Sequence, residues 1–218
     1  MSVGKWIAAG FGVAALSAVV VQAQYPDTGE PAYTLVQEDT AFQLRDYPAI
    51  VVAEVTHSGS RREASSKSFR RLAAYIFAQD RPAGGERIAM TSPVIQDRRA
   101  QNESIEMTAP VLQDEAVEGQ WRMRFVMPAK FTLETLPKAP ADITLTKVPA
   151  RRMATVRFNG YARPNEIAIM EAKLTEWMKD QGIKAISGFE YAFYDAPMVP
   201  GERRRNEVMI EVAAPDFD

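Results

Sequence analysis

One order of elements occurs twice in the sequence, and it limits the folds that the chain can adopt. Apolar residues recur at helical spacing over residues 63–79 and again over 164–181. Each predicted helix stands between stretches in which apolar and polar residues alternate, a pattern typical of strands. Two successive sets of strands, helix, strand and strand predict a pseudo-symmetric α+β domain, with one antiparallel sheet or distorted barrel and two helices outside it. No linker rich in Gly, Ser or Pro separates the two sets, so we expect no division into independent domains.

The helical spacing also identifies the residues expected to face the sheet. The two apolar stripes consist of Phe69, Leu72, Ala73 and Ile76 in the first helix and Ile167, Met170, Leu174 and Trp177 in the second. The predicted strands cover residues 33–38, 42–45, 50–57, 88–96, 105–113, 121–127, 143–148, 153–158, 189–194 and 207–212.

A short internal repeat lies between the two helices. Residues 88–96 and 105–113 share the pattern I-x-M-T-[SA]-P-V-[IL]-Q. Proline within a predicted strand indicates an edge, a bulge or a strand end, because proline has no N–H to donate. We therefore interpret the repeat as serving the fold, with Met90 and Met107 as residues that line a cleft.

The N-terminal residues have the pattern of a signal peptide. Lys5 precedes an uncharged, mostly apolar run over residues 6–21, and Ala23 ends a predicted cleavage site. We expect cleavage near Ala23 and export to the periplasm or the medium, followed by a polar lead-in over 24–32. The alternative is an uncleaved segment that anchors the protein in a membrane.

The composition excludes several kinds of chemistry. The chain has no cysteine and a single histidine, His57, so it cannot form disulfides, thiolate metal sites or two-histidine metal sites. The net charge of −2 argues against a nucleic-acid partner. Asp46, Glu54 and Glu190 are available carboxylates, yet their spacing picks out no acid–base pair. We therefore expect a binding protein rather than an enzyme.

Five motifs, in order along the chain, resemble landmarks of the SOUL haem-binding protein family. They are the F-Q-L-R-D-Y-P stretch at 42–48, the helix residues 63–76, the I-A-M-T-S-P-V stretch at 88–94, Y-D-A-P at 194–197 and R-N-E-V at 205–208. The resemblance extends over a domain of residues 33–213, which leaves a tail at 214–218.

The resemblance implies both a fold and a ligand. The fold would be two ferredoxin-like halves that form a twisted eight-stranded barrel with two flanking helices. The ligand would be haem or a related tetrapyrrole, held non-covalently in a hydrophobic cleft near the first helix and the barrel. Some family members have a histidine in the opening motif that is proposed to bind iron, but this chain has Asp46 there. The resemblance therefore favours a tetrapyrrole-sized cleft over iron held by histidine.

Several side chains are candidates for holding such a ligand. Lys67, Arg70 and Arg71 on the first helix could pair with haem propionates. Tyr47 and Tyr75 could bind ferric iron as phenolates. The predicted binding set is Tyr47, Lys67, Phe69, Arg70, Ala73, Met90 and Met107. His57 is the one possible imidazole ligand, although it precedes a Ser-Gly-Ser turn where histidine is usually solvated. Arg205 is interpreted as a structural ion-pair or strand-end residue.

These observations predict an exported, non-enzymatic protein that binds haem or a related tetrapyrrole reversibly. The alternative is a barrel that binds another small apolar ligand, or a protein partner, at the cell envelope. A membrane would be involved only through an uncleaved N-terminal segment.

Overall fold

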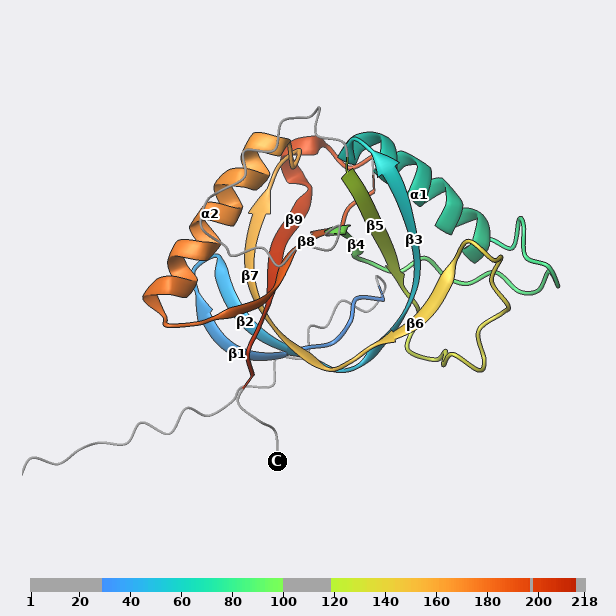
Figure 1. Cartoon of the computed structure of the whole chain (residues 1–218), viewed down its shortest axis with the longest axis horizontal. Helices are drawn as coiled ribbons and strands as arrows, with labels where there is room; N and C mark the ends of the chain where they lie inside the picture. Colours follow the sequence, from blue (N-terminus) through green and yellow to red (C-terminus); the bar gives the residue numbers. More distant parts are fainter. Residues whose placement is uncertain (1–28, 100–118, 197, 215–218) are drawn as a thin grey trace, which may run out of the picture.

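A computed structural model describes residues 29–99, 119–196 and 198–214 (Figure 1). These residues form nine strands and two α-helices in an α+β arrangement, as expected. The strands are β1 (Thr34–Asp39), β2 (Phe42–Tyr47), β3 (Ile50–Gly59), β4 (Val94–Arg99), β5 (Gly119–Val126), β6 (Thr144–Val148), β7 (Arg151–Asn159), β8 (Ala185–Phe193) and β9 (Arg205–Val212). The helices are α1 (Arg61–Ile76) and α2 (Pro164–Asp180), and a short 3₁₀ helix, η1, covers Gly201–Arg203.

All nine described strands belong to one antiparallel sheet, in the order β1-β2-β7-β9-β8-β4-β5-β3-β6. The expectation of a closed eight-stranded barrel is wrong. Within the described residues, β1 pairs with β2 and β6 pairs with β3, but the two outer strands do not pair with each other. The sheet therefore curls strongly yet stays open (Figure 1).

The same pairing order occurs on both sides of the β4–β8 contact. In the segment β3-α1-β4-β5 the strands pair as β3-β5-β4, and in β7-α2-β8-β9 they pair as β7-β9-β8. The strand beside β3 is β6, which follows its segment in the chain, whereas the strand beside β7 is β2, which precedes it. Two ferredoxin-like halves stay a prediction.

Local residues set the ends of the helices. The Ser60 side chain accepts a hydrogen bond from the backbone N–H of Glu63, and Glu63 reaches back to Ser60, so α1 begins two residues before the predicted start. It ends at Ile76, before Ala78 adopts a φ of 58°. In α2, Pro164 occupies the first turn as expected, and Gly182 follows the helix with a φ of 68°.

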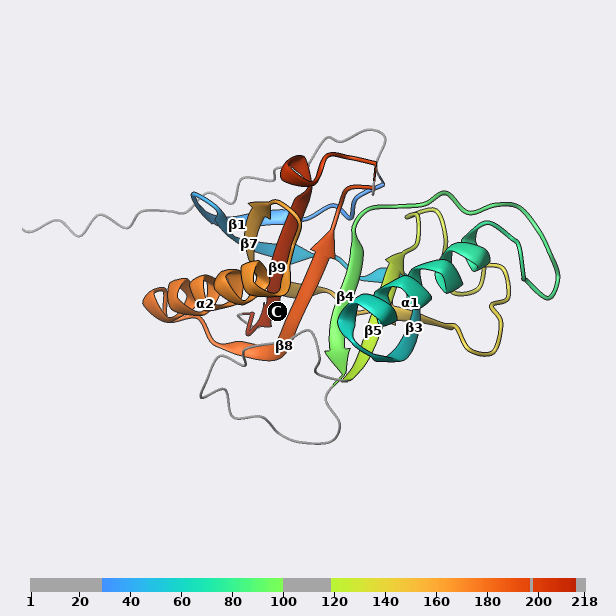
Figure 2. The same ribbon diagram turned by 90° about the horizontal axis from the view of Figure 1, so that it is seen from above.

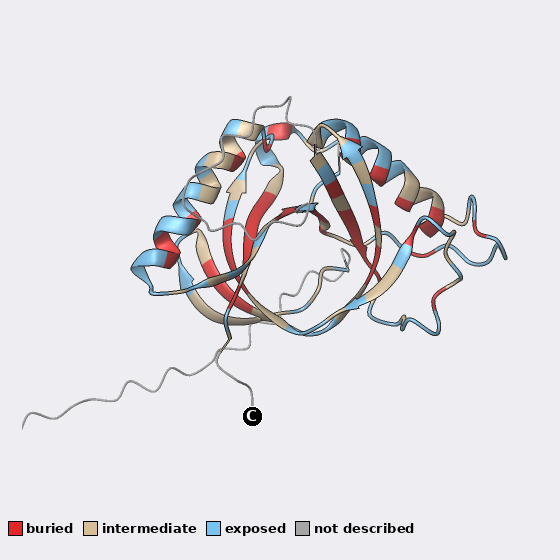
Figure 3. Cartoon of the chain, viewed as in Figure 1, coloured by how far each residue is buried: buried red, intermediate tan, exposed pale blue. Residues whose placement is uncertain are grey.

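Both helices lie on the outer face of the curled sheet, over different strands (Figure 2). Under α2, Leu174 and Trp177 pack with outward residues of β7 and β9 such as Val156 and Val208. Under α1, Leu72 and Ile76 pack with outward residues of β3 and β5. Figure 3 shows buried residues along these strands and along the helix sides that face them. The repeat at 88–96 contributes only β4, which begins after Pro93, and its second copy lies outside the described residues.

The inner face of the sheet carries charged residues, because neighbouring residues of a strand point to opposite faces. Arg122 and Arg124 of β5 both bind Asp97 of β4, with N–O distances of 2.8 and 3.1 Å. Arg124 also lies 2.9 Å from Glu190 of β8, which in turn binds Arg151 of β7 at 2.6 Å. A chain of alternating charges therefore connects four strands across the interior.

Glu190 makes the free energy of unfolding depend on pH. Burial alone would raise the pKa of its carboxyl, but Arg124 and Arg151 outweigh burial and lower the pKa to about 2. Because the pKa of Glu190 is lower in the folded state, its carboxylate stabilises the protein at pH values above 4.5, the pKa in the unfolded chain. This contribution is lost as the pH falls to about 2. We expect the loss to be about 3 kcal/mol in the free energy of unfolding, measured by urea unfolding between pH 7 and pH 2.

Variants test this assignment. Glu190→Gln should lower the stability at pH 7 by about 3 kcal/mol, because it leaves two buried guanidinium groups underpaired, and should flatten the acid-dependent loss. Glu176→Gln, at an exposed position of α2, is the matched control and should retain the wild-type pH profile. An unchanged profile in Glu190→Gln would contradict the assignment.

Candidate functional site

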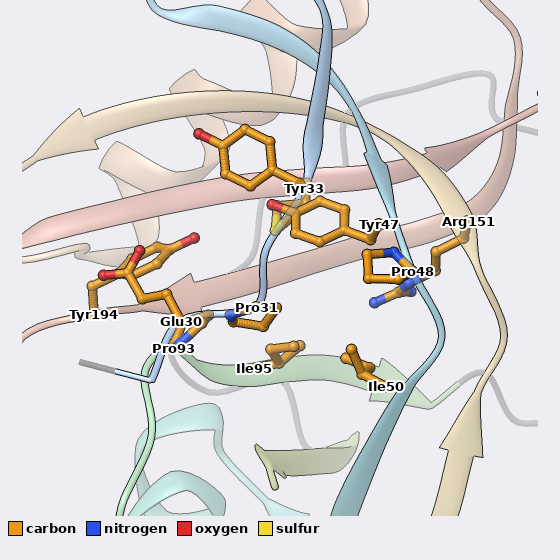
Figure 4. A pocket seen from close by; sticks show the side chains of 11 residues that line it. Glu30, Pro31, Tyr33, Tyr47, Pro48, Ile50, Pro93, Ile95, Arg151 and Tyr194 are labelled. Carbon is orange, nitrogen blue, oxygen red and sulfur yellow. The ribbon is translucent and has the colours of Figure 1, made fainter. Parts of the chain in front are cut away.

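A pocket opens on the inner face of the sheet, opposite to the face that the helices cover (Figure 4). Its cavity volume is about 30 Å³. The lining residues come from five strands and the segments next to them: Glu30, Pro31, Tyr33, Tyr47, Pro48, Ile50, Pro93, Ile95, Arg151, Tyr194 and Met209.

One wall of the pocket is apolar. Ile50 begins β3, Ile95 is the second residue of β4, and Met209 points inward from the middle of β9. Pro48 follows β2 and Pro93 precedes β4. At these positions the missing N–H of proline does not remove a hydrogen bond between strands. This wall offers a surface suited to the face of an apolar ring.

Three tyrosines, Tyr33, Tyr47 and Tyr194, also line the pocket, and Tyr47 and Tyr194 belong to the same apolar cluster as Met209. The Tyr33 and Tyr47 rings are tilted against each other, with centroids 5.4 Å apart. The Arg45 guanidinium lies 4.5 Å from the centroid of the Tyr33 ring, and the Arg205 guanidinium lies 3.8 Å from that of Tyr194. Each contact places a cation over an aromatic face, where the ring quadrupole attracts it.

A buried ion pair orients two of these tyrosines. Arg45 of β2 binds Glu207 of β9 through two hydrogen bonds of 2.8 Å, and both side chains are 1 % exposed. Arg45 also donates to the Tyr47 hydroxyl at 2.9 Å, while the Tyr194 hydroxyl donates to Glu207 at 2.5 Å. Burial raises the pKa of Tyr47 and of Tyr194, so both phenols stay protonated at neutral pH.

Arg151 is a guanidinium that lines the pocket itself. It makes two hydrogen bonds to Glu190, of 2.6 and 2.9 Å, and its Nη1 lies 3.7 Å from Glu211. Burial alone would lower the pKa of Arg151, but the hydrogen bonds to Glu190 outweigh it and raise the pKa. Arg151 is therefore a fixed positive charge at the edge of the apolar wall.

Of the predicted binding residues, Tyr47 lines this pocket. Lys67, Phe69, Arg70 and Ala73 lie on α1, on the other side of the sheet. Lys67 and Arg70 are exposed, and Phe69 meets the Phe125 ring edge-on with centroids 5.4 Å apart. Met90 is exposed before β4, and Met107 lies outside the described residues. A role in ligand binding stays a prediction for each of these residues.

His57 lies under α1 rather than in the pocket. Its Nδ1 is 2.9 Å from the Ser68 hydroxyl. A serine beside a histidine is also an arrangement for nucleophilic catalysis, but Ser68 is 1 % exposed, so a substrate could not reach it. Among the described residues, no three histidine or acidic side chains gather in a way that could hold a metal ion.

The sequence-based reasoning missed most of the pocket. Three lining residues lie within predicted strands, Ile50, Ile95 and Met209, and Arg151 lies two residues before one. No local sequence pattern shows that these strands meet in space. One signal was available: Arg45 and Glu207 both occur in the family-like motifs, and each is next to an apolar residue of a predicted or adjoining strand, Leu44 and Val208. A charge at such a position indicates a buried partner of opposite charge.

A second pocket, of about 350 Å³, lies beside the turn between β1 and β2. It is lined by Thr40, Ala41, Gln43, Arg157, Phe158 and Asn159. With a single aromatic ring and walls that are as polar as they are apolar, it suits a flat apolar ligand less well than the first pocket does.

In the part of the chain that the structure describes, neither helix is both long and apolar enough to cross a membrane.

Comparisons with known proteins give a family and a fold. Residues 28–211 match the family described as SOUL heme-binding protein. Comparison with curated proteins found no match. Three solved structures share the fold: the EcmrR C-terminal domain (14 % identity, TM-score 0.56, 79 % of this chain and 96 % of that one), an uncharacterized conserved protein from Listeria innocua (11 %, 0.55, 82 % and 95 %) and a hydrolase from Listeria innocua (10 %, 0.52, 81 % and 94 %).

At these identities the solved structures show the fold alone. The family match covers most of the chain, so the protein belongs to the SOUL heme-binding protein family.

Proposed function

We propose that the protein binds haem or a related tetrapyrrole reversibly in the pocket on the inner face of the sheet, without chemical change to the ligand. The observation that carries the proposal is the pairing of the apolar wall at Ile50, Ile95 and Met209 with tyrosine rings and arginines at its edge. A tetrapyrrole has the same division, because its ring is flat and apolar and its propionates are anionic. Family membership supports this ligand class.

Burial of the ring would supply most of the binding free energy. At about 25 cal/mol per Å², a few hundred Å² of apolar surface is enough for micromolar affinity after the cost of association. Arg151 is close enough to the wall to attract a propionate, although it already binds Glu190. We expect the ligand to be carried or buffered rather than converted.

Iron would contribute little to this binding. Asp46 stands where some family members have histidine, and its carboxylate binds Arg152 through hydrogen bonds of 2.7 and 2.8 Å. The phenols of Tyr47 and Tyr194 stay protonated, which makes them poor ligands for ferric iron. Met209 supplies a thioether in the lining, a weaker donor than imidazole for ferric iron.

Export is part of the proposal. The leader-like residues 1–23 lie outside the described residues, and their pattern supports delivery to the periplasm or the medium after cleavage near Ala23. An uncleaved segment would place the same domain at the membrane surface.

A second candidate function is binding of a smaller apolar ligand, or of a protein partner, at the cell envelope. It is favoured by the cavity volume of about 30 Å³, since typical small-molecule sites have about 300–1,000 Å³. Native mass spectrometry of the purified protein would detect such a ligand.

The role of iron is tested by comparing haemin with metal-free protoporphyrin IX. Absorbance and fluorescence titrations of the form without residues 1–23 should give dissociation constants in the micromolar range that agree within about threefold, because ring burial dominates. An affinity for haemin more than tenfold higher would contradict this account and would point to Met209 as an iron ligand. Absence of binding below about 50 μM for both would overturn the proposed function.

The position of the site is tested by a matched pair of variants on opposite faces of the sheet. Ile50→Ser removes a half-buried apolar side chain from the pocket wall, and Phe69→Ser removes a partly exposed one from α1. We expect Ile50→Ser to weaken protoporphyrin binding by about tenfold, from the lost apolar contact, and Phe69→Ser to leave it unchanged. The opposite result would place the ligand at α1, as the family resemblance implies.

A further inference from the structure

The segment before β1 crosses the pocket on the inner face. We call residues 29–33 the strap; Glu30, Pro31 and Tyr33 within it are lining residues of the pocket. Figure 4 shows Glu30 beside Tyr194 and Pro93, with Pro31 facing the apolar wall. The strap therefore forms part of the lining of the pocket.

The carboxylate of the strap is bound by Arg205, the first residue of β9. The Glu30 carboxylate accepts a hydrogen bond from Arg205 and forms an ion pair with it, and the two side chains are only 12 % and 22 % exposed. Arg205 is positioned independently, because its guanidinium lies on the Tyr194 ring and its backbone N–H donates to Asp195 at 2.5 Å. Departure of Glu30 would leave this cation in place at the pocket edge.

The rest of the strap lies close against the molecule. Gly29 has a φ of 61°, and a side-chain carbon built on it would be 3.0 Å from Cγ2 of Thr91. Tyr33 contacts Tyr47 and Arg45 through its ring. These contacts join the strap to β2 and to the segment before β4, the two elements that contribute Pro48 and Pro93 to the wall.

We propose that Arg205 is the residue of the pocket that binds a carboxylate of the ligand. When no ligand is bound, the Glu30 carboxylate occupies the position of that ligand carboxylate. The inference rests on the proposed function and deepens it. A propionate and a glutamate present the same carboxylate to a guanidinium, so they compete for one position. Binding then requires the strap to leave, and the observed dissociation constant equals the intrinsic one divided by the fraction of molecules with the strap displaced.

A reversible disulfide tests the strap. The carbon built on Gly29 is 3.4 Å from Cβ of Thr91, near the separation of about 3.5–4.5 Å that a disulfide requires. The chain has no cysteine of its own, so Gly29→Cys with Thr91→Cys creates one possible intramolecular bond. The probe is metal-free protoporphyrin IX, which excludes iron–thiolate binding. We expect the oxidised variant to bind at least tenfold more weakly than the same protein after reduction. The Gly29→Cys single variant, which also carries a side chain at a φ of 61°, is the control and should be insensitive to oxidation.

Charge variants test the role of Arg205. Glu30→Gln should tighten protoporphyrin IX binding by roughly three- to tenfold, because the competing carboxylate is removed. Arg205→Gln removes the carboxylate-binding cation and also releases Glu30. It should therefore tighten binding of the dimethyl ester of protoporphyrin IX, which has no carboxylates, by roughly three- to tenfold. It should not tighten binding of protoporphyrin IX, so the affinity for the acid relative to the ester should fall by about tenfold. Arg62→Gln, at an exposed position of α1, is the matched control.

The outcomes separate this inference from the proposed function. Equal affinity in the oxidised and reduced forms would overturn the claim that the strap must leave for the ligand to bind, while the proposal of tetrapyrrole binding would stand. An unchanged ratio of acid to ester affinity in Arg205→Gln would overturn the carboxylate-binding role of Arg205. Lack of porphyrin binding by the wild type, the reduced variant and Glu30→Gln alike would overturn the proposed function together with the inference.

Discussion

The interior of the sheet is organised around the bidentate ion pair between Arg45 of β2 and Glu207 of β9. These strands flank β7, so the pair reaches across β7 and connects the second strand of the chain to the last. Both charges are almost fully buried, and removing one partner would leave the other uncompensated in a medium of low polarity. The same two side chains hold the hydroxyls of Tyr47 and Tyr194, so the ion pair also sets how the pocket presents its rings.

The position of the site follows from the two faces of a curled sheet. Strand alternation gives each strand one outward and one inward set of side chains. Helices cover the outer face, which is apolar in clusters under α1 and α2. No helix of the described residues covers the inner face, and its centre is filled by paired arginines and carboxylates with smaller apolar patches around Val52 and Met153. The pocket lies where such a patch meets the charged groups.

The sequence predicts the elements far better than their contacts. Both helices are evident because apolar spacing of 3.6 residues is a local signal, and Pro164 marks the start of α2. Closure of the sheet depends on whether β1 and β6 pair, and no local pattern reports this. The pocket depends on register in the same way: Arg45 and Glu207 are 162 residues apart in the chain. Basic residues on an exposed helix, such as Lys67 and Arg70, attract attention as ligand partners, although the same pattern describes a solvated face.

Arg45, Arg151 and Arg205, which line the pocket or contact its tyrosines, differ in how easily each could exchange its carboxylate partner. Arg45 and Arg151 bind carboxylates that belong to the sheet, Glu207 and Glu190, which cannot withdraw without disturbing β9 or β8. Arg205 binds Glu30, which lies on a segment before the first strand and outside the ladder of hydrogen bonds. If a ligand carboxylate displaced Glu207 or Glu190, the displaced carboxylate would stay unpaired inside the protein, at a cost of several kcal/mol. Glu30 lies on a peripheral segment, so it can move into water together with its backbone. A ligand carboxylate would therefore replace Glu30 at Arg205 more readily than it would replace either carboxylate of the sheet.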